Sequence, residues 1–130
     1  MTGLIVATHG DLALAALNVV EMFTGSQKQV QTIGFRSGDS LEDLLDRFQA
    51  ALEALSDCED ILAVTDLKGG SPCNAATVMK MKNNSVRVIA GFSIPVLIQF
   101  FEDRENGMTL AESMETLLDV GKLSLSEISL

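Results

Sequence analysis

Four short apolar segments constrain the fold of this chain most. They are rich in β-branched residues, each is followed by a turn signal, and they span residues 4–6, 30–35, 61–64 and 86–90. Their apolar character is continuous rather than alternating, which is typical of strands that are covered on both faces. We therefore predict an α/β fold with four strands in a mostly parallel sheet flanked by helices.

Helical patterns separate the predicted strands. Between the second and third strands, residues 41–55 place apolar side chains on one side of a 3.6-residue wheel. Ser40 and Asp43 supply a start that resembles a capping box, so this helix should begin near residue 41. An earlier apolar stripe predicts a helix over residues 12–23, with Gly25 suited to its end.

A third helix is predicted after the third strand, because Pro72 is favoured in a first helical turn and Ser71 is a good cap. This gives the order βαβαβαβ for the first four strands. Beyond them, we predict one helix from Pro95 to about Phe101 and another that ends before Gly121.

The end of the chain reads Leu-Ser-Leu-Ser from Leu123 onward. This alternation resembles a short half-buried strand. The chain shows no internal repeat, low-complexity tract or linker, and its 130 residues are the length of one domain. We therefore expect a single domain over residues 1–130.

The composition excludes several classes of function. The 47% of apolar residues are ample for a core, and the formal charge of −9 offers no basic stripe for a phosphate backbone, so nucleic-acid binding is disfavoured. The longest uncharged run, 88–101, contains Gly91 and Pro95 and is shorter than the ~20 apolar residues that cross a bilayer. The N-terminus lacks the pattern of a secretory signal. Cys58 and Cys73 are too few for a disulfide framework or, with one histidine, a four-ligand zinc site, so we expect a cytoplasmic protein.

Two residues that can carry chemistry follow the first and third predicted strands. His9, the only histidine, comes after the first strand, and Asp66 follows the third. Open α/β sheets bind ligands at the carboxyl ends of their strands. If these two strands are neighbours, His9 and Asp66 face one another at that edge. A neutral imidazole could then accept a phosphoryl group while the carboxylate fixes its tautomer, although a lone histidine at a strand end is more often a hydrogen-bonded turn residue.

The segment after Asp66 could hold the phosphoryl group. Backbone N–H groups of Gly69, Gly70 and Ser71, at the start of a helix, form an anion cradle, and Ser71 can add its hydroxyl. Lys68 could offset the charge of the phosphoryl oxygens. The same residues can also form an ordinary strand-to-helix turn with a solvated lysine.

Taken together, these motifs resemble those of a known family, the IIA component of the mannose-class (mannose, fructose and sorbose) sugar phosphotransferase system. The resemblance covers nearly the whole chain in order and spacing. The motifs that carry it are Thr8-His9-Gly10, Asp66-x-x-Gly69-Gly70-Ser71-Pro72-x-Asn74 and Ile94-Pro95.

The resemblance implies a phosphotransferase with a phosphohistidine intermediate. In this family His9 would accept phosphoryl from the carrier protein HPr and pass it to a cognate IIB domain. IIB would then phosphorylate sugar during uptake through the membrane components IIC and IID. Asp66 would pair with His9, Ser71 would contact the phosphoryl group, and no cofactor or metal would be required.

The resemblance also implies a doubly wound sheet and a homodimer in which an antiparallel C-terminal strand is exchanged between subunits. Other functions remain open on the residues alone. One is delivery of phosphoryl to a dihydroxyacetone kinase, and another is a regulatory module controlled by phosphorylation of His9. A third is an anion-binding domain that uses the turn at 69–71 without covalent chemistry.

Overall fold

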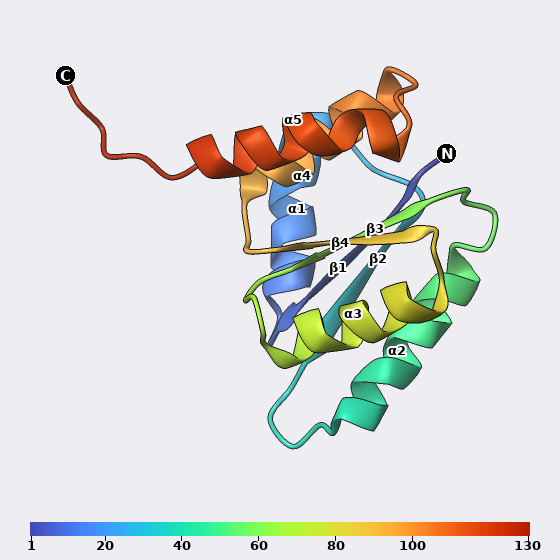
Figure 1. Ribbon diagram of the computed structural model, residues 1–130. Helices are drawn as coiled ribbons and strands as arrows, with labels where there is room; N and C mark the ends of the chain where they lie inside the picture. Colours follow the sequence, from blue (N-terminus) through green and yellow to red (C-terminus); the bar gives the residue numbers. More distant parts are fainter.

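The computed structural model describes residues 1–130, as four strands and five helices (Figure 1). The predicted order βαβαβαβ is confirmed, and two further helices follow it. None of the helices combines the length and apolar character needed to span a bilayer. In chain order the elements are β1 (Gly3–His9), α1 (Leu12–Thr24), β2 (Val30–Phe35), α2 (Leu41–Ala54), β3 (Ile61–Thr65), α3 (Ser71–Lys82), β4 (Val86–Ala90), α4 (Ile94–Glu105) and α5 (Leu110–Leu123).

The four strands form one parallel sheet in the order β2-β1-β3-β4. The chain winds from β1 to β2 on one side and then crosses to β3 on the other side of β1. The direction of winding therefore reverses between β1 and β3. The predicted doubly wound α/β fold is confirmed, and this reversal is where such sheets open a ligand site at the strand ends.

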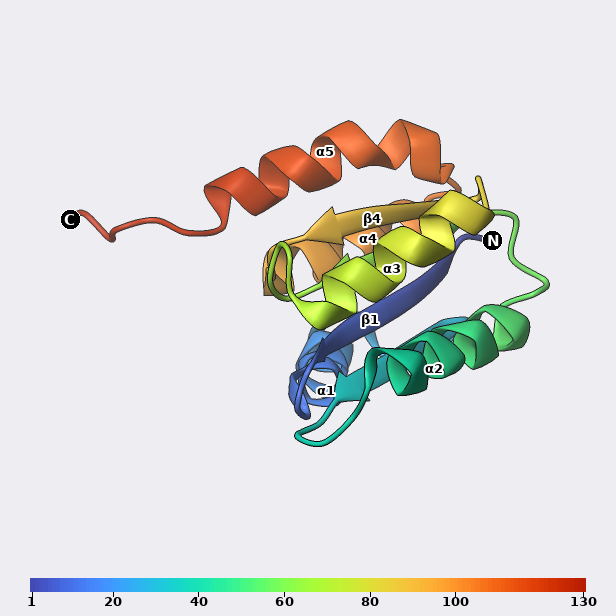
Figure 2. The same cartoon turned by 60° about the horizontal axis from the view of Figure 1, so that its bottom comes forward.

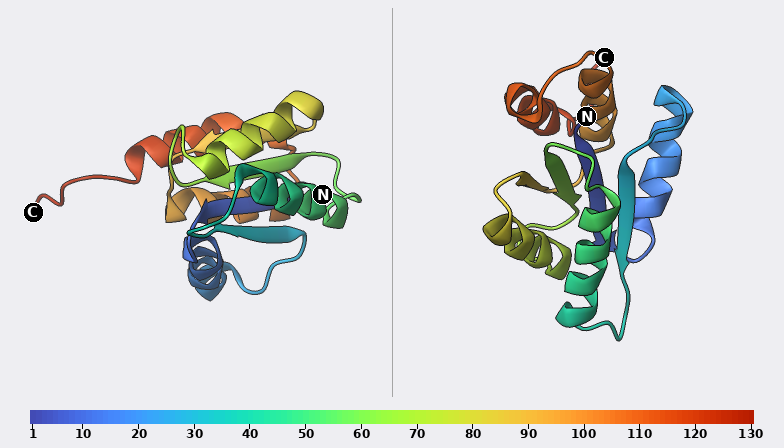
Figure 3. Two further views of the ribbon diagram at one scale, coloured as in Figure 1. Left: turned by 90° about the horizontal axis from the view of Figure 1, so that it is seen from below. Right: turned by 90° about the vertical axis from the view of Figure 1, so that its right-hand side faces the viewer.

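Both faces of the sheet are covered (Figure 3). Leu4 and Val6 of β1 pack in a core shared with α1, α4 and α5. Ile5 and Ala7, which alternate with them along the strand, pack in a second core shared with α2 and α3. Burial on both faces explains why the central strands β1 and β3 are almost continuously apolar, whereas the edge strands β2 and β4 are only partly buried.

Side chains bind the first turns of four helices, α1, α2, α4 and α5, and the one at α2 was predicted. At α2 the Ser40 hydroxyl accepts the Asp43 N–H at 3.0 Å, and the Asp43 carboxylate accepts the Ser40 N–H at 2.9 Å. The predicted capping box is thus confirmed. At α1 the buried Thr8 hydroxyl accepts the Ala13 N–H at 2.8 Å, which ties the helix to the end of β1.

The predicted cap of α3 is wrong by one residue. Gly70 occupies the N-cap position, Ser71 is already the first helical residue, and no side chain caps the helix. The backbone turns at Gly69, with φ of 82°, and Gly70 is extended, so helical geometry begins immediately before Pro72. The Ser71 hydroxyl is consequently not used to close the helix.

The C-terminal region differs most from its sequence interpretation. The prediction that the last helix ends before Gly121 is wrong, because α5 continues to Leu123. A Cβ on Gly121 would stand 3.2 Å from Val96 Cγ2, so the glycine lets α5 pack closely on α4. The predicted strand from Leu123 is wrong for the single chain. Helix α5 extends to Leu123, and residues 124–130 are exposed and form no strand (Figure 1). Alternation alone cannot make a strand where no neighbour offers hydrogen bonds. Exchange of this tail between subunits stays a prediction.

Candidate functional site

The structure brings His9 and Asp66 together at the carboxyl edge of the sheet. His9 is the last residue of β1, Asp66 follows β3, and the two strands are direct neighbours. His9 Nδ1 lies 2.9 Å from Asp66 Oδ2, which also accepts the His9 backbone N–H at 3.0 Å. The other carboxylate oxygen accepts the Leu67 N–H at 3.0 Å. One carboxylate oxygen of Asp66 is thus bound by the backbone of its own loop, and the other binds both the backbone and the ring of His9.

The charge of Asp66 sets the tautomer of His9. Burial raises the pKa of Asp66, but the hydrogen bonds from the His9 ring and backbone together lower it by more. The pKa of Asp66 therefore lies below its usual value. The carboxylate is therefore ionised at neutral pH and can only accept. Nδ1 must carry the ring proton, which leaves Nε2 with its lone pair free. The His9 side chain is 43% exposed and that of Asp66 only 10%, so the histidine is the reachable member.

Two further contacts restrain the imidazole. The ring of Phe35, at the end of β2, meets the His9 ring edge-on, with centroids 5.9 Å apart and planes at 86°. A Cβ added to Gly70 would stand 3.0 Å from His9 Cε1, so glycine at this position lets the ring keep its place without a shift. Sequence analysis did not single out Phe35. The signal was present, because Phe35 ends the second predicted strand at the same sheet edge.

The loop between β3 and α3 presents unused backbone donors. The N–H groups of Gly69, Ser71 and Cys73 make no hydrogen bond within the chain, whereas the Gly70 N–H donates to Leu67 O at 3.0 Å. Gly70 therefore contributes its lack of a side chain rather than its N–H. Open N–H groups at a helix start, together with the helix dipole, favour an anion. This loop suits a phosphoryl group beside His9.

Lys68 lies in the same loop but takes no part in the arrangement of His9 and Asp66. Its side chain is exposed and forms no ion pair. The structure thus brings together the predicted histidine, carboxylate, glycines and serine, and it leaves the lysine free in solvent.

The chain is similar to known proteins along most of its length. A family described as the PTS system fructose IIA component matches residues 3–118. The PTS system mannose-specific EIIAB component of Escherichia coli K12 is 31% identical over 119 residues, which are 92% of this chain and 37% of that protein. The chain therefore spans little more than a third of the length of that relative. The sorbose-specific EIIA component of Klebsiella pneumoniae is 34% identical over 104 residues, covering 80% of this chain and 76% of its own.

Solved structures show the same likeness. The PTS IIA protein associated with the fucose utilization operon from Streptococcus pneumoniae superposes with a TM-score of 0.87 at 29% identity. The match covers 97% of this chain and 92% of that one. The architecture described above is therefore shared with an experimentally solved IIA protein along almost its full length.

Proposed function

Because the chain belongs to the family of PTS fructose IIA components, we propose that it relays phosphoryl groups in a sugar phosphotransferase system. In this proposal His9 accepts phosphoryl from HPr and passes it to a cognate IIB domain. The observation that carries the proposal is the 2.9 Å contact between His9 Nδ1 and Asp66, which orients the ring and leaves Nε2 free.

The transfer requires two bond changes. The lone pair of His9 Nε2 attacks phosphorus while the bond from phosphorus to the donor side chain breaks, and the donor atom leaves with that electron pair. The Nδ1 proton stays in place, and Asp66 stabilises the positive charge that develops on the ring. Transfer to IIB reverses these steps, with His9 as the leaving group.

The β3–α3 loop provides the electrostatic part of the mechanism. We expect the N–H groups of Gly69, Ser71 and Cys73 and the Ser71 hydroxyl to bind the phosphoryl oxygens, since fixed donors act without reorganising. The exposed Lys68 can offset part of the negative charge of the phosphoryl oxygens. A relay must also release its group, and the partial exposure of His9 lets two partners reach it in turn.

We also propose that the protein acts in the cytoplasm, where sugar arrives through IIC and IID, and that it is a homodimer. The tail supports an exchange of C-terminal segments, because Leu125, Ile128 and Leu130 are exposed in the single chain. The edge of β4 supports it as well, since this strand ends the sheet without a further neighbour.

Labelling with radioactive phosphoenolpyruvate, enzyme I and HPr tests the relay. The wild-type chain should acquire label that is stable at alkaline pH and lost in acid, and His9→Ala should acquire none. Circular dichroism of His9→Ala checks that it remains folded. Labelling of His9→Ala at the wild-type level would exclude His9 from the mechanism.

A second assay separates the possible acceptors. Purified labelled protein is mixed with a IIB domain or with a dihydroxyacetone kinase, and the loss of label is followed. The proposal expects transfer to IIB. Transfer only to the kinase would assign a different pathway, and label retained with both acceptors would favour a regulatory role.

A further inference from the structure

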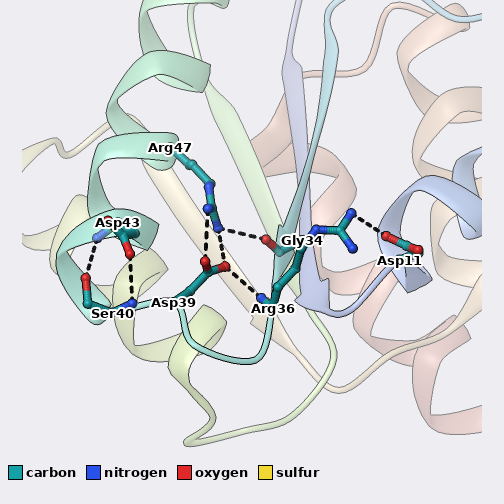
Figure 4. Close-up of polar contacts among 7 residues, drawn as sticks. All are labelled: Asp11, Gly34, Arg36, Asp39, Ser40, Asp43 and Arg47. Carbon is teal, nitrogen blue, oxygen red and sulfur yellow. Dashed lines mark hydrogen bonds and ion pairs between the residues drawn. The ribbon is translucent and has the colours of Figure 1, made fainter.

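An exposed ion pair lies beside His9, on the side opposite the β3–α3 loop. Arg36 Nη2 is 2.6 Å from Asp11 Oδ1, and the two side chains are 63% and 71% exposed (Figure 4). Asp11 belongs to the loop between β1 and α1, and Arg36 to the loop between β2 and α2. The pair therefore joins the two loops that flank His9 on this side.

Chain connectivity keeps both members near the imidazole. Asp11 is two residues after His9, so their Cα atoms are at most about 7 Å apart. Arg36 directly follows Phe35, whose ring contacts the His9 ring and whose carbonyl accepts the Gly10 N–H at 2.8 Å. The arginine thus extends from a backbone that is bonded to the turn carrying His9.

The backbone of Arg36 is fixed, but its guanidinium is not. The Arg36 N–H donates to Asp39 Oδ2 at 2.8 Å, and Arg47 holds that carboxylate at 2.6 and 3.3 Å (Figure 4). Arg47 also donates to Gly34 O at 3.1 Å, which ties this anchor to β2. The guanidinium itself bonds only to Asp11. Exposed ion pairs are weak contacts, so this one can be exchanged for a stronger partner.

We propose that Arg36 is a phosphoryl-binding residue that pairs with Asp11 while His9 is unmodified and moves to the phosphoryl oxygens once His9 carries them. This inference rests on the proposed function. A phosphoryl group brings close to two negative charges, against one on Asp11, and its oxygens suit the planar fork of a guanidinium. The movement leaves Asp11 as an unpaired carboxylate beside the site only in the phosphorylated protein.

This exchange would give the two forms of the protein different surfaces. In the unmodified form the Arg36 and Asp11 charges compensate one another, and a partner that delivers phosphoryl meets a neutral pair. In the phosphorylated form Arg36 is engaged by the phosphoryl group, and the next partner meets a free carboxylate. Charge patterns of this kind affect the rate and choice of association.

The equilibrium constant for phosphoryl exchange with phosphorylated HPr measures the proposed contact. Arg36→Gln should lower this constant by about fivefold, the size that an ion pair of good geometry reaches. Asp11→Asn should raise it, since Arg36 is then no longer held elsewhere, and Arg36→Lys should restore part of the loss. Arg87→Gln is the matched control, because it removes the same charge from an exposed arginine of β4 that forms no ion pair.

The direction of the Asp11 effect distinguishes binding from a structural role. If the pair only stabilises the loops, Asp11→Asn and Arg36→Gln should shift the constant in the same direction, and that result would overturn the inference. Equal constants for Arg36→Gln and Arg87→Gln would overturn it as well. Failure of the wild-type chain to accept any label would instead contradict the proposed function. Thermal unfolding of each variant confirms that folded proteins are compared.

Discussion

Helices α2 and α3 start at the same edge of the sheet, yet their first turns are satisfied in opposite ways (Figure 2). At α2, Ser40 and Asp43 close the helix start with two reciprocal hydrogen bonds. At α3, Gly70 is the N-cap and no side chain closes the helix. An unsatisfied helix start therefore distinguishes the loop before α3, which we propose to bind the phosphoryl group, from the loop before α2.

The carboxylates of the two preceding loops show the same division. Asp39, in the loop before α2, is held mainly by the Arg47 side chain of α2, which lowers its pKa to about 2. Asp66 is held by the His9 ring and backbone, and its ionised form sets the tautomer of His9. An ionised carboxylate therefore holds an arginine of α2 in one place and orients the ring of His9 in the other.

The largest expected effect comes from Asp66→Asn. The neutral amide cannot stabilise positive charge on the ring, so phosphoryl transfer from HPr should slow by roughly 10²–10³-fold. This is within the range of rate losses seen when a side chain positioned for acid–base catalysis is removed. The rate of labelling from phosphoenolpyruvate measures it. Asp39→Asn is the matched change before α2. It should lower the urea midpoint and slow transfer far less than Asp66→Asn, because Asp39 does not contact His9. Similar transfer rates for the two variants would abolish the distinction between the loops.

Gly70→Ala should have the next largest effect. Its Cβ would stand 3.0 Å from His9 Cε1, so the ring would have to shift by a few tenths of an ångström. A misplacement of about 1 Å can cost roughly 10² in rate, and we expect this smaller shift to slow transfer by roughly 10–10²-fold. Stability should change little, because the φ of −73° suits alanine. Gly38→Ala reverses the pattern: its φ of 90° strains the folded state by about 1–2 kcal/mol, while a Cβ there meets no neighbour. Urea unfolding should therefore detect a loss of stability only in Gly38→Ala, and the labelling rate should fall only in Gly70→Ala.

A smaller contrast is expected for two serines. Ser71→Ala removes one proposed hydroxyl donor and should slow transfer by about tenfold, the size of one hydrogen bond to a charged group. Ser40→Ala removes the cap of α2 and should cost about 1 kcal/mol of unfolding free energy without slowing transfer. If Ser71→Ala destabilised the protein and left transfer unchanged, Ser71 would be a structural residue after all.

The smallest expected effect is on the pH dependence of stability. The pKa of Asp39 falls from 3.8 to about 2 on folding, so its contribution to stability is complete above about pH 4 and lost as the pH falls toward 2. The difference in urea midpoint between the wild-type chain and Asp39→Asn should therefore shrink between pH 5 and pH 2. A constant difference over this range would show that the ion pair with Arg47 does not cause it.

The sequence predicted those features that depend on local chemistry. Strand ends, the capping box at Ser40 and the neighbourhood of His9 and Asp66 all follow from residue patterns and from the rule for parallel strands. Gly121 was misinterpreted because its small size serves contact with Val96, a residue 25 positions earlier in the sequence. No local pattern records such a contact.

The site was predictable in its residues but not in its hydrogen bonds. The sequence indicated an anion cradle. Only the structure shows that the Gly70 N–H donates to Leu67 O within the turn, while the Cys73 N–H stays free. The contact of Phe35 with His9 depends on the register between β1 and β2, which pairs the two residues. The sequence of either strand alone does not predict that register. The ion pair of Asp11 and Arg36 joins separate loops and is equally invisible in the sequence.

The central claim is that His9 carries phosphoryl on Nε2 while Asp66 holds Nδ1. Nuclear magnetic resonance of the phosphorylated protein, with ¹⁵N-labelled histidine at alkaline pH, tests it directly because the chain has one histidine. We expect phosphorus–nitrogen coupling at Nε2 and none at Nδ1. Coupling at Nδ1, or phosphoryl on any other side chain, would contradict the account.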